Sequence, residues 1–379
     1  MKINQAYRTE NNGWIYIQEK TKLNNPIVLV FANRFLLENQ ELIQDIRNEF
    51  PYEHIVFGST SGEIIGNLVY ESSITVTAIE FDKSTFAIET ENILNYDKNA
   101  LNLGKALFNK IDKKNLKHLF VLSEGSFVNG SSLINGLEDQ IDDSVSVTGG
   151  MCGDDSRFEK TLASYKEDPK VGEVVLIGFY GETLEISFAS FGGWLPFGPE
   201  RVITKSEGNT LYEIDGQPAL DLYKKYLGEK ASELPQSSLL FPLNVTPIGK
   251  TEPVVRTILN IDNENNSMIL AGDVPMHSKV QLMMASIDGI SEGACYAAKL
   301  AMKGRINDPE IAILVSCIGR KLAMNQRVEE EIEQVQDVIG KKTAITGFYS
   351  YGEIAPFSGT STATCELHNQ TMTLTLISE

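Results

Sequence analysis

A strand–helix–strand pattern that occurs three times along the chain constrains the fold more than any other feature. Each copy begins with a short run of Val, Ile and Leu, continues with apolar residues at helical spacing, and ends in a second short apolar run. The short apolar runs predict buried strands, and the helical spacing of the apolar residues between the two runs predicts a helix. The copies cover residues 26–58, 118–150 and 310–348. We interpret them as an internal repeat of β-α-β units, which predicts an α/β fold with mixed sheets.

The three copies also end in the same kind of loop, in which a glycine, a short insert and a second glycine precede a carboxylate. These loops read GSTSGE at 58–63, GGMCGD at 149–154 and GFYSYGE at 347–353. Ligands bind beyond the carboxyl ends of the strands in open sheets of this type, and glycines let a backbone approach a small molecule closely. We therefore expect the three loops to line one ligand crevice.

The residue types in these loops suit a zwitterion such as an amino acid. Carboxylates accept hydrogen bonds from an amine, and the planar fork of Arg320, in the segment SCIGR, suits a carboxylate. The alternative is that the acids cap turns and the glycines only permit tight bends. The predicted ligand-binding residues are Ser59, Ser61, Glu63, Cys152, Asp154, Asp155, Cys317, Arg320, Tyr349, Tyr351 and Glu353.

Alternating stretches between the repeats predict three antiparallel hairpins. Their turns are expected at Asp82-Lys83, Gly181-Glu182 and His368-Asn369. A chain of 379 residues is longer than one hydrophobic core usually grows, so two domains are expected, at 25–210 and 211–379. The predicted fold is therefore α/β, with two domains whose mixed sheets combine repeated β-α-β units and antiparallel hairpins.

Composition narrows the classes of partner. The chain carries 33 basic and 51 acidic residues, a net charge of −18, which repels phosphate backbones and anionic lipid. We thus expect neither nucleic-acid binding nor membrane binding. No apolar run approaches the ~20 residues of a bilayer span, and the polar start lacks a signal-peptide core. The four cysteines are widely spaced without a C-x-x-C pair. This spacing fits a reducing compartment, so the predicted location is cytoplasmic, with no metal site.

Two alternatives involve cysteine and histidine. Cys152 and Cys317 could act as nucleophiles, which leaves a cysteine-dependent hydrolase or transferase using Cys317 open, although buried structural cysteines are common. His277 has Met276, Met283 and Met284 nearby, which suggests haem ligation. A loop histidine beside a methionine-rich helix face is the simpler interpretation, and the cofactor stays unknown.

Five segments, taken together, resemble the FIST proteins, in which a FIST N domain precedes a FIST C domain. They are GSTSGEI, TGGMCGDD, SCIGR, GFYSYGEIAP and LHNQT, which occur in the family's order over residues 25 to 377. The resemblance implies a cytoplasmic sensor of small molecules, such as amino acids, in bacterial signal transduction. Some relatives are haem-binding nitric oxide sensors that regulate a histidine kinase. We expect a stand-alone sensor, not an enzyme, that signals through a partner such as a histidine kinase; a pure interaction scaffold is a further alternative.

Overall fold

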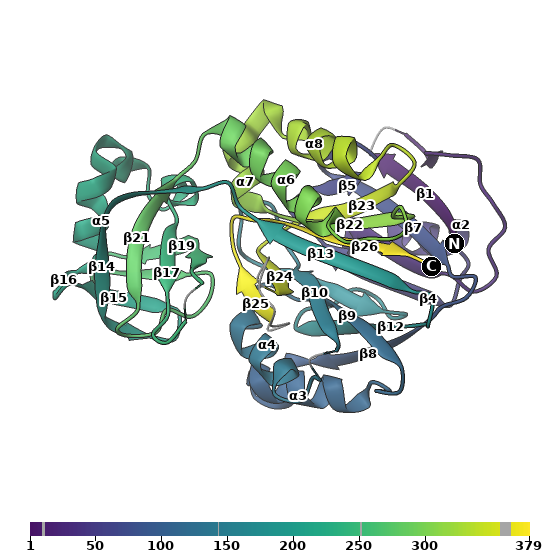
Figure 1. The fold of residues 1–379 in the computed structure, drawn as a ribbon, viewed down its shortest axis with the longest axis horizontal. Helices are drawn as coiled ribbons and strands as arrows, with labels where there is room; N and C mark the ends of the chain where they lie inside the picture. Colours follow the sequence, from purple (N-terminus) through teal and green to yellow (C-terminus); the bar gives the residue numbers. More distant parts are fainter. Residues whose placement is uncertain (10–11, 143, 251, 357–364) are drawn as a thin grey trace.

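The computed structural model describes residues 1–9, 12–142, 144–250, 252–356 and 365–379. The chain forms a large body and a smaller inserted domain, residues 195–284, which stands to one side of it (Figure 1). Residues up to 191 and from 287 onward build the body, so the chain leaves the body once and returns once. Among the described helices, none is long and apolar enough to cross a bilayer.

The body holds three six-stranded sheets, one for each predicted repeat. Repeat 1 forms a sheet with the order β11-β4-β3-β7-β1-β2. Its strands are β1 (Lys2–Thr9), β2 (Ile15–Tyr16), β3 (Ile27–Ala32), β4 (His54–Ser59), β7 (Ser73–Glu80) and β11 (Ala163–Tyr165), with helices α1 (Arg34–Leu37) and α2 (Gln40–Glu49).

Repeat 2 forms the sheet β25-β24-β10-β9-β12-β8. Its strands are β8 (Thr85–Asn92), β9 (Leu116–Ser123), β10 (Ser146–Met151), β12 (Glu173–Tyr180), β24 (Gly352–Pro356) and β25 (Cys365–His368). Its helices are α3 (Ala100–Lys110), α4 (Gly130–Glu138) and a 3-10 turn at Ile93–Tyr96.

Repeat 3 forms the sheet β13-β26-β22-β23-β5-β6. Its strands are β5 (Glu63–Ile65), β6 (Leu68–Tyr70), β13 (Glu185–Phe191), β22 (Ile311–Cys317), β23 (Ala344–Ser350) and β26 (Met372–Ser378). Its helices are α6 (Ile287–Met302), α7 (Ile318–Met324), α8 (Glu329–Ile339) and a 3-10 turn at Asn325–Arg327.

The predicted β-α-β repeat is confirmed, because β3 and β4, β9 and β10, and β22 and β23 are parallel pairs. Each repeat also gives a strand to its neighbour. The strand after the loop of repeat 1, β5, pairs with β23; the one after the loop of repeat 3, β24, pairs with β10; and the one after the loop of repeat 2, β11, pairs with β4. This cyclic exchange draws the three loops together at one place.

The strand pairing predicted for the three hairpins is wrong. The strand β7 pairs with β1 and β3, whereas β8 pairs with β12 in the next sheet. In the second expected hairpin, β12 pairs with β9 in the sheet of repeat 2, whereas β13 pairs with β26 in the sheet of repeat 3. In the third, β25 pairs with β24, whereas β26 pairs with β22. At each expected turn the chain crosses between sheets. Residues 360–364 of the third expected hairpin lie outside the described residues.

The inserted domain is a curved antiparallel sheet covered by one helix. Its strands run in the order β18-β17-β21-β14-β15-β20-β19, with β16 on β15. They are β14 (Leu195–Glu207), β15 (Thr210–Ile214), β16 (Gln217–Pro218), β17 (Leu243–Thr246), β18 (Val254–Arg256), β19 (Ile258–Asp262), β20 (Ser267–Leu270) and β21 (Lys279–Met284). The helix is α5 (Ala219–Leu227), and 3-10 turns lie at Gly228–Glu233 and Gln236–Leu240. The expected boundary after residue 210 falls within β15.

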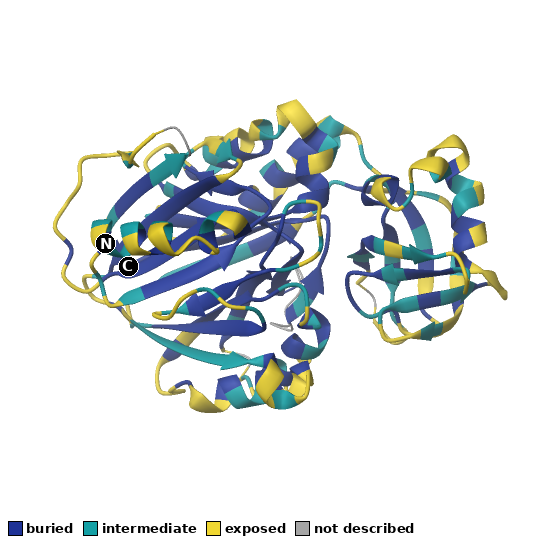
Figure 2. Ribbon diagram, turned by 180° about the vertical axis from the view of Figure 1, so that it is seen from behind, coloured by how far each residue is buried: buried dark blue, intermediate teal, exposed yellow. Residues whose placement is uncertain are grey.

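The core of the body lies where the three sheets face one another. Phe31 of repeat 1, Phe120 of repeat 2 and Phe348 of repeat 3 belong to one buried cluster, and the rings of Phe31 and Phe348 lie 4.7 Å apart. The strands of the body are largely buried, and its helices expose one face to solvent (Figure 2). The inserted domain has a core of its own, which includes Tyr223 of α5. The core of the inserted domain is separate from the clusters of the body, which is the physical basis for treating the two parts as separate bodies. A small apolar cluster that includes Met283 and Ile290 lies at their junction.

Candidate functional site

The three glycine-framed loops meet at the carboxyl ends of the parallel strands. A cyclic set of main-chain hydrogen bonds joins them, each loop donating to the next. The bonds run from the amide of Ser61 to the carbonyl of Tyr349 (2.8 Å), from Tyr351 to Met151 (3.1 Å) and from Gly153 to Ser59 (2.9 Å). These bonds relate Thr60, Cys152 and Ser350 as equivalent positions in repeats 1, 2 and 3.

The carboxylates of repeats 1 and 3 point into the protein. Glu63 accepts from the Thr60 hydroxyl at 2.5 Å and from the hydroxyl and amide of Ser73 at 2.6 and 3.2 Å. Glu353 accepts from the Ser350 hydroxyl at 2.5 Å and from the hydroxyl and amide of Thr371 at 2.9 and 3.1 Å. Both side chains are fully buried, and burial raises the pKa of Glu63 to about 7 and that of Glu353 to about 8.

The acids of repeat 2 contact repeat 1 instead. Asp154 is buried and accepts from the Arg34 guanidinium at 2.9 Å, and burial raises the pKa of this carboxyl. Asp155 accepts from the Asn33 amide at 3.0 Å and from Arg157 at 2.5 Å, and it is partly exposed. The loop of repeat 2 is therefore attached to the start of α1.

Arg320 is engaged by protein groups. Its guanidinium is buried and contacts the Glu331 carboxylate at 2.8 and 2.9 Å. It also donates to the carbonyls of Gly192 and Ile290, the second at 2.9 Å. Gly192 lies where the chain leaves the body and Ile290 where it returns. Arg320 thus connects the two segments that lead to the inserted domain, in place of the ligand carboxylate expected from the sequence.

The remaining predicted residues are also turned inward, with one exception. Ser59 donates to the carbonyl of Gly153 at 2.9 Å, Ser61 donates to that of Asp155 at 3.1 Å, and Tyr349 donates to Glu331 at 2.6 Å. Cys152 and Cys317 are buried, and burial raises the pKa of both thiols. The exception is Tyr351, which forms part of a crevice between the body and the inserted domain.

This crevice consists of two cavities of about 340 and 280 Å³ that share Phe158 and Leu259. The body supplies the first cavity with residues 125–130, Met151, Phe158, Tyr351 and Leu367, and the inserted domain supplies Asn209, Leu259, Leu270, Ala271 and Gly272. The second cavity is lined by Ser156, Phe158, Pro235, Gln236, Leu239, Ile258 and Leu259. Sites at a domain interface and beyond the carboxyl ends of parallel strands are where ligands usually bind.

Local sequence explains how repeat 2 forms its wall of the crevice. After β9 the carboxylate of Glu124 accepts from the amides of Ser126 and Phe127 at 2.7 and 2.8 Å, which fixes a turn. The side chain of Asn129 then accepts from the amide of Ser132 and caps α4. The ring of Phe158 stacks on that of Tyr351 with centroids 4.4 Å apart. A turn, a cap and a ring stack therefore hold this wall in place.

The family motif HNQT joins the body to the inserted domain. The side chain of Asn369 accepts from the amide of Thr257 at 3.3 Å. Gln370 donates to the carbonyl of Leu239 at 2.9 Å and to the hydroxyl of Thr257 at 3.1 Å. Arg256 of β18 donates back to the carbonyl of Leu367 at 2.6 Å. These bonds lie directly behind the crevice.

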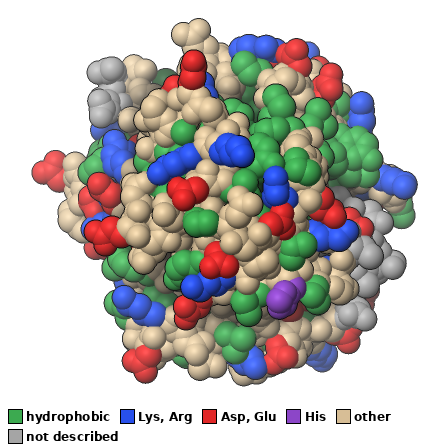
Figure 3. Space-filling model, turned by 90° about the vertical axis from the view of Figure 1, so that its left-hand side faces the viewer, with side chains coloured by type: hydrophobic (Ala, Val, Ile, Leu, Met, Phe, Trp, Pro, Cys, Tyr) green, Lys and Arg blue, Asp and Glu red, His purple; other side chains and the backbone are tan. Residues whose placement is uncertain are grey.

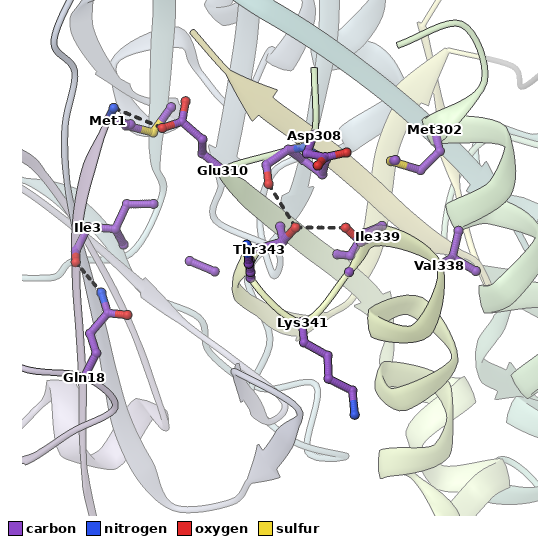
Figure 4. Close-up of a pocket in the computed structure, with 14 residues that line it drawn as sticks. Met1, Ile3, Gln18, Met302, Asp308, Glu310, Val338, Ile339, Lys341 and Thr343 are labelled. Atoms are coloured by element: carbon purple, nitrogen blue, oxygen red, sulfur yellow. Dashed lines mark hydrogen bonds and ion pairs between the residues drawn. The ribbon is translucent and has the colours of Figure 1, made fainter. Parts of the chain in front are cut away.

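A larger cavity, of about 570 Å³, lies elsewhere on the body (Figure 4). It is lined by Ile3 of β1, Glu310, Lys341, Thr343 and other residues near the amino ends of β22 and β23. The hydroxyl of Thr343 donates to the carbonyls of Pro309 and Ile339. This cavity lies at the opposite strand ends from the loops, so the crevice is the better candidate site.

The sequence interpretation missed most of the crevice. Phe158 and Leu259 stand 101 positions apart and carry no motif. The one available signal was the segment SEGSFVNG directly after the second repeat's first strand, where small residues surround an exposed phenylalanine, Phe127. Among the described residues, no three His, Cys, Asp or Glu side chains gather as a metal site.

Comparison with known families identifies the chain. The FIST N domain matches residues 26–217, and the FIST C domain matches residues 219–356. The chain belongs to the FIST family. FIST domains are sensor domains of signal transduction, so the family and its two-part order are as the sequence predicted. The two matches meet inside the inserted domain, between β16 and α5.

Individual relatives are distant. The uncharacterized protein MJ1623 of Methanocaldococcus jannaschii is 26% identical, over 93% of this chain and 74% of its own length. A chorismatase crystal structure covers 100% of this chain and 98% of its own, with 7% identity and a TM-score of 0.35. A cyanuric acid hydrolase from A. caulinodans covers 78% of this chain and 99% of its own, with 8% identity and a TM-score of 0.18.

Proposed function

We propose that this FIST protein is a sensor that binds a small ligand in the crevice between the body and the inserted domain. Binding there changes the placement of the inserted domain, and that change is the signal. A ligand shifts such an equilibrium only if it binds one arrangement better than the other, which a crevice shared by two bodies allows. The single observation that carries the proposal is that both bodies contribute walls to the same two cavities.

The segments that connect the two bodies support such a motion. Gly193 has a φ of +87°, and a Cβ there would lie 2.0 Å from the carbonyl oxygen of Gly289. The outgoing and returning segments therefore touch at glycines, next to the guanidinium of Arg320. These fixed contacts make the two segments the pivot about which the inserted domain would turn, as in hinges of other two-part proteins.

The predicted ligand-binding residues divide into three groups in this proposal. Tyr351 contacts the ligand directly, because it lines the crevice. Asp154, Asp155 and Ser61 support the segment that carries Phe158. The other predicted residues hold the loops in register or fix the connecting segments.

An amino acid is the ligand class that the family resemblance implies. The groups expected to hold its two charges, Arg320 and the loop carboxylates, are engaged within the protein. An amino acid in the crevice would therefore meet mainly aromatic, amide and main-chain groups. This conflict motivates the narrower ligand class inferred below.

The structure supports the haem and enzyme alternatives less well. His277 is exposed on the inserted domain and lies outside both cavities of the crevice, as do Met276, Met283 and Met284. The high thiol pKa of buried Cys317 makes a reactive thiolate unfavourable at neutral pH. A Soret band after addition of haem, or a covalent adduct trapped at Cys317, would revive the respective alternative.

The proposed output partner is another protein, such as a histidine kinase in the cytoplasm. The outer end of the inserted domain mixes hydrophobic, acidic and basic side chains (Figure 3). A surface of mixed character suits contact with a protein better than contact with a polyanion, because no single sign of charge dominates it.

The proposal is tested by screening metabolites for thermal stabilisation. A ligand at 100 times its dissociation constant adds about 2.7 kcal/mol to the unfolding free energy. Leu259→Trp, which places a bulky ring where the two cavities meet, should abolish the stabilisation, whereas Ile248→Trp, on the exposed surface of the same domain, should leave it unchanged. Small-angle scattering should then show a ligand-dependent change in shape. Stabilisation that survives Leu259→Trp would place the ligand elsewhere.

A further inference from the structure

We infer that the ligand of the crevice is an uncharged molecule with a flat, aromatic or otherwise apolar part. This inference rests on the proposed function and names the ligand class of that site. It departs from the zwitterionic ligand that the loop acids and Arg320 suggest from the sequence.

The first observation is the absence of charge in the lining. None of the described residues that line either cavity is Asp, Glu, Lys, Arg or His, although 22% of the chain is charged. An ionised group that enters such a site loses its hydration without gaining a partner of opposite charge, which strongly disfavours its binding. A zwitterion would incur this cost twice.

The second observation concerns the charged groups that flank the lining. Glu124 accepts from the amides of Ser126 and Phe127 at 2.7 and 2.8 Å, and the ammonium of Lys98 lies 5.6 Å from the centre of the Phe127 ring. Arg256 and Asp273 flank the crevice behind Gly272. Arg256 is buried and donates to the carbonyls of Asp273 and Leu367 at 3.1 and 2.6 Å. The carboxylate of Asp273 accepts from Asn129 at 3.1 Å. The two residues differ in sign, lie outside the lining and already bind neighbouring groups. They stabilise the junction of the two bodies and leave the cavity without a net charge of its own.

The third observation is the aromatic surface. The stacked rings of Phe158 and Tyr351 lie beside the junction of the two cavities, and Phe127 is 46% exposed at the first cavity. An aromatic ligand packed on such rings gains favourable ring-to-ring contact beyond the apolar area that it buries. Leu259, Leu270 and Leu367 add aliphatic contacts.

The polar groups in the lining are neutral and few. They are Ser126, Asn129, Asn209 and Tyr351 in the first cavity and Ser156 and Gln236 in the second. The side chains of Asn129 and Asn209 already donate to Asp273 and to the carbonyl of Leu270. Hydroxyl and amide groups of this kind orient a ligand through one or two hydrogen bonds, which is the usual division of work in an apolar pocket. A cavity of about 340 Å³ is near the lower limit of typical small-molecule sites, so a ligand with one or two rings fits it.

The experiment uses pairs of probes that share a ring and differ in charge. N-acetyl-L-phenylalaninamide is compared with L-phenylalanine, and indole with L-tryptophan, as the first members of a fragment library with equal numbers of uncharged and ionised aromatic compounds. Binding to the full chain is measured by saturation-transfer NMR and titration calorimetry. The uncharged members are expected to bind at least 10-fold more tightly than their ionised counterparts.

Two variants show whether any binding occurs in the crevice. Phe158→Ala should weaken binding at least 10-fold and Leu259→Trp should abolish it, whereas Tyr296→Ala, at an exposed tyrosine of α6, should change nothing. Ionised fragments that bind more tightly than uncharged ones, and lose binding in Leu259→Trp, would overturn the ligand class and leave the proposed function standing. If no fragment of either kind depends on the crevice residues, both the ligand class and the proposed site are wrong.

Discussion

The loops of repeats 1 and 3 are closed onto their own sheets, whereas the loop of repeat 2 is open. In the closed loops a buried glutamate accepts from one hydroxyl three positions before it and from a second hydroxyl on the neighbouring antiparallel strand. Glu63 uses Ser73 on β7, and Glu353 uses Thr371 just before β26. The strand registers place Asp155 and Glu173 at these two positions in repeat 2.

The two acidic residues at these positions explain why the loop of repeat 2 is not closed onto its own sheet. Two carboxylates would have to share one buried site, and like charges in close contact destabilise each other. The first hydroxyl is also replaced by the thiol of Cys152, which is a weak donor. The segment after the loop extends outward instead, Asp154 pairs with Arg34, and Phe158 reaches the crevice. The comparison teaches that the proposed ligand site lies beside the one repeat whose loop departs from the pattern of the other two.

The largest effect is expected at Arg320, which belongs to a closed repeat and fixes the connecting segments. Arg320→Met would leave the Glu331 carboxylate buried without its cation, together with the carbonyls of Gly192 and Ile290. Breaking one side of a buried ion pair costs about 3–5 kcal/mol. Urea denaturation should show this loss, and hydrogen exchange should increase around Gly192 and Ile290.

The matched control for this prediction removes both charges. Arg320→Met combined with Glu331→Gln should recover part of the lost stability, because no uncompensated charge remains. Equal stability of the single and double variants would mean that the carbonyl contacts, and not the ion pair, hold the connecting segments.

A smaller loss is expected when a closed loop is opened. Glu353→Ala would leave the hydroxyl of Ser350 and both donors of Thr371 without an acceptor and would create a cavity, at a cost of about 2–4 kcal/mol. Glu353→Gln should cost less than about 1.5 kcal/mol, since its amide oxygen can accept from Thr371 while its nitrogen donates to Ser350. Chemical denaturation of both variants measures the difference. A glutamine variant as unstable as the alanine variant would show that the carboxyl group itself is required.

The sequence predicted the units of this fold better than their assembly. Apolar runs and helical spacing located the parallel pairs. The partners of β8, β13 and β25 could not be predicted, because a short polar turn and two alternating strands look the same whether the strands pair or enter different sheets. Alternation indicates which face of a strand is buried, but it does not identify the neighbouring strand.

The candidate site was predicted only in part for a related reason. The sequence placed the three loops together, and the loops do meet, but the direction of each side chain depends on partners far along the chain. Glu63 turns inward because Ser73 supplies two donors, and Arg320 is engaged because Glu331 lies one helix later. The crevice itself depends on an inserted domain that returns to the body, and Leu259 carries no local sign of that return.

Stability should also depend on pH through the closed repeats. Burial raises the pKa of Glu63 to about 7 and of Glu353 to about 8, so the folded protein keeps these protons at pH values where the unfolded chain has lost them. The free energy of unfolding should therefore fall as pH rises from about 5 to about 8, by at most ~1.4 kcal/mol per pH unit for each carboxyl. Denaturation midpoints across this range should show the slope, and Glu353→Gln should reduce it. An unchanged slope in Glu353→Gln would mean that Glu353 is ionised throughout.

The smallest effect is expected at the open loop, at the position equivalent to the two buried glutamates. Asp155 is partly exposed, and its partners Asn33 and Arg157 can be solvated when the carboxylate is removed, so Asp155→Ala should cost less than about 1 kcal/mol. The same urea measurement as for Glu353→Ala makes the comparison direct. Because Asp155 precedes the segment that carries Phe158, its removal should raise hydrogen exchange at residues 155–160 while β9 and β10 stay protected. A loss as large as that of Glu353→Ala would show that the loop of repeat 2 is as tightly closed as the others, and the physical reason for placing the ligand beside it would disappear.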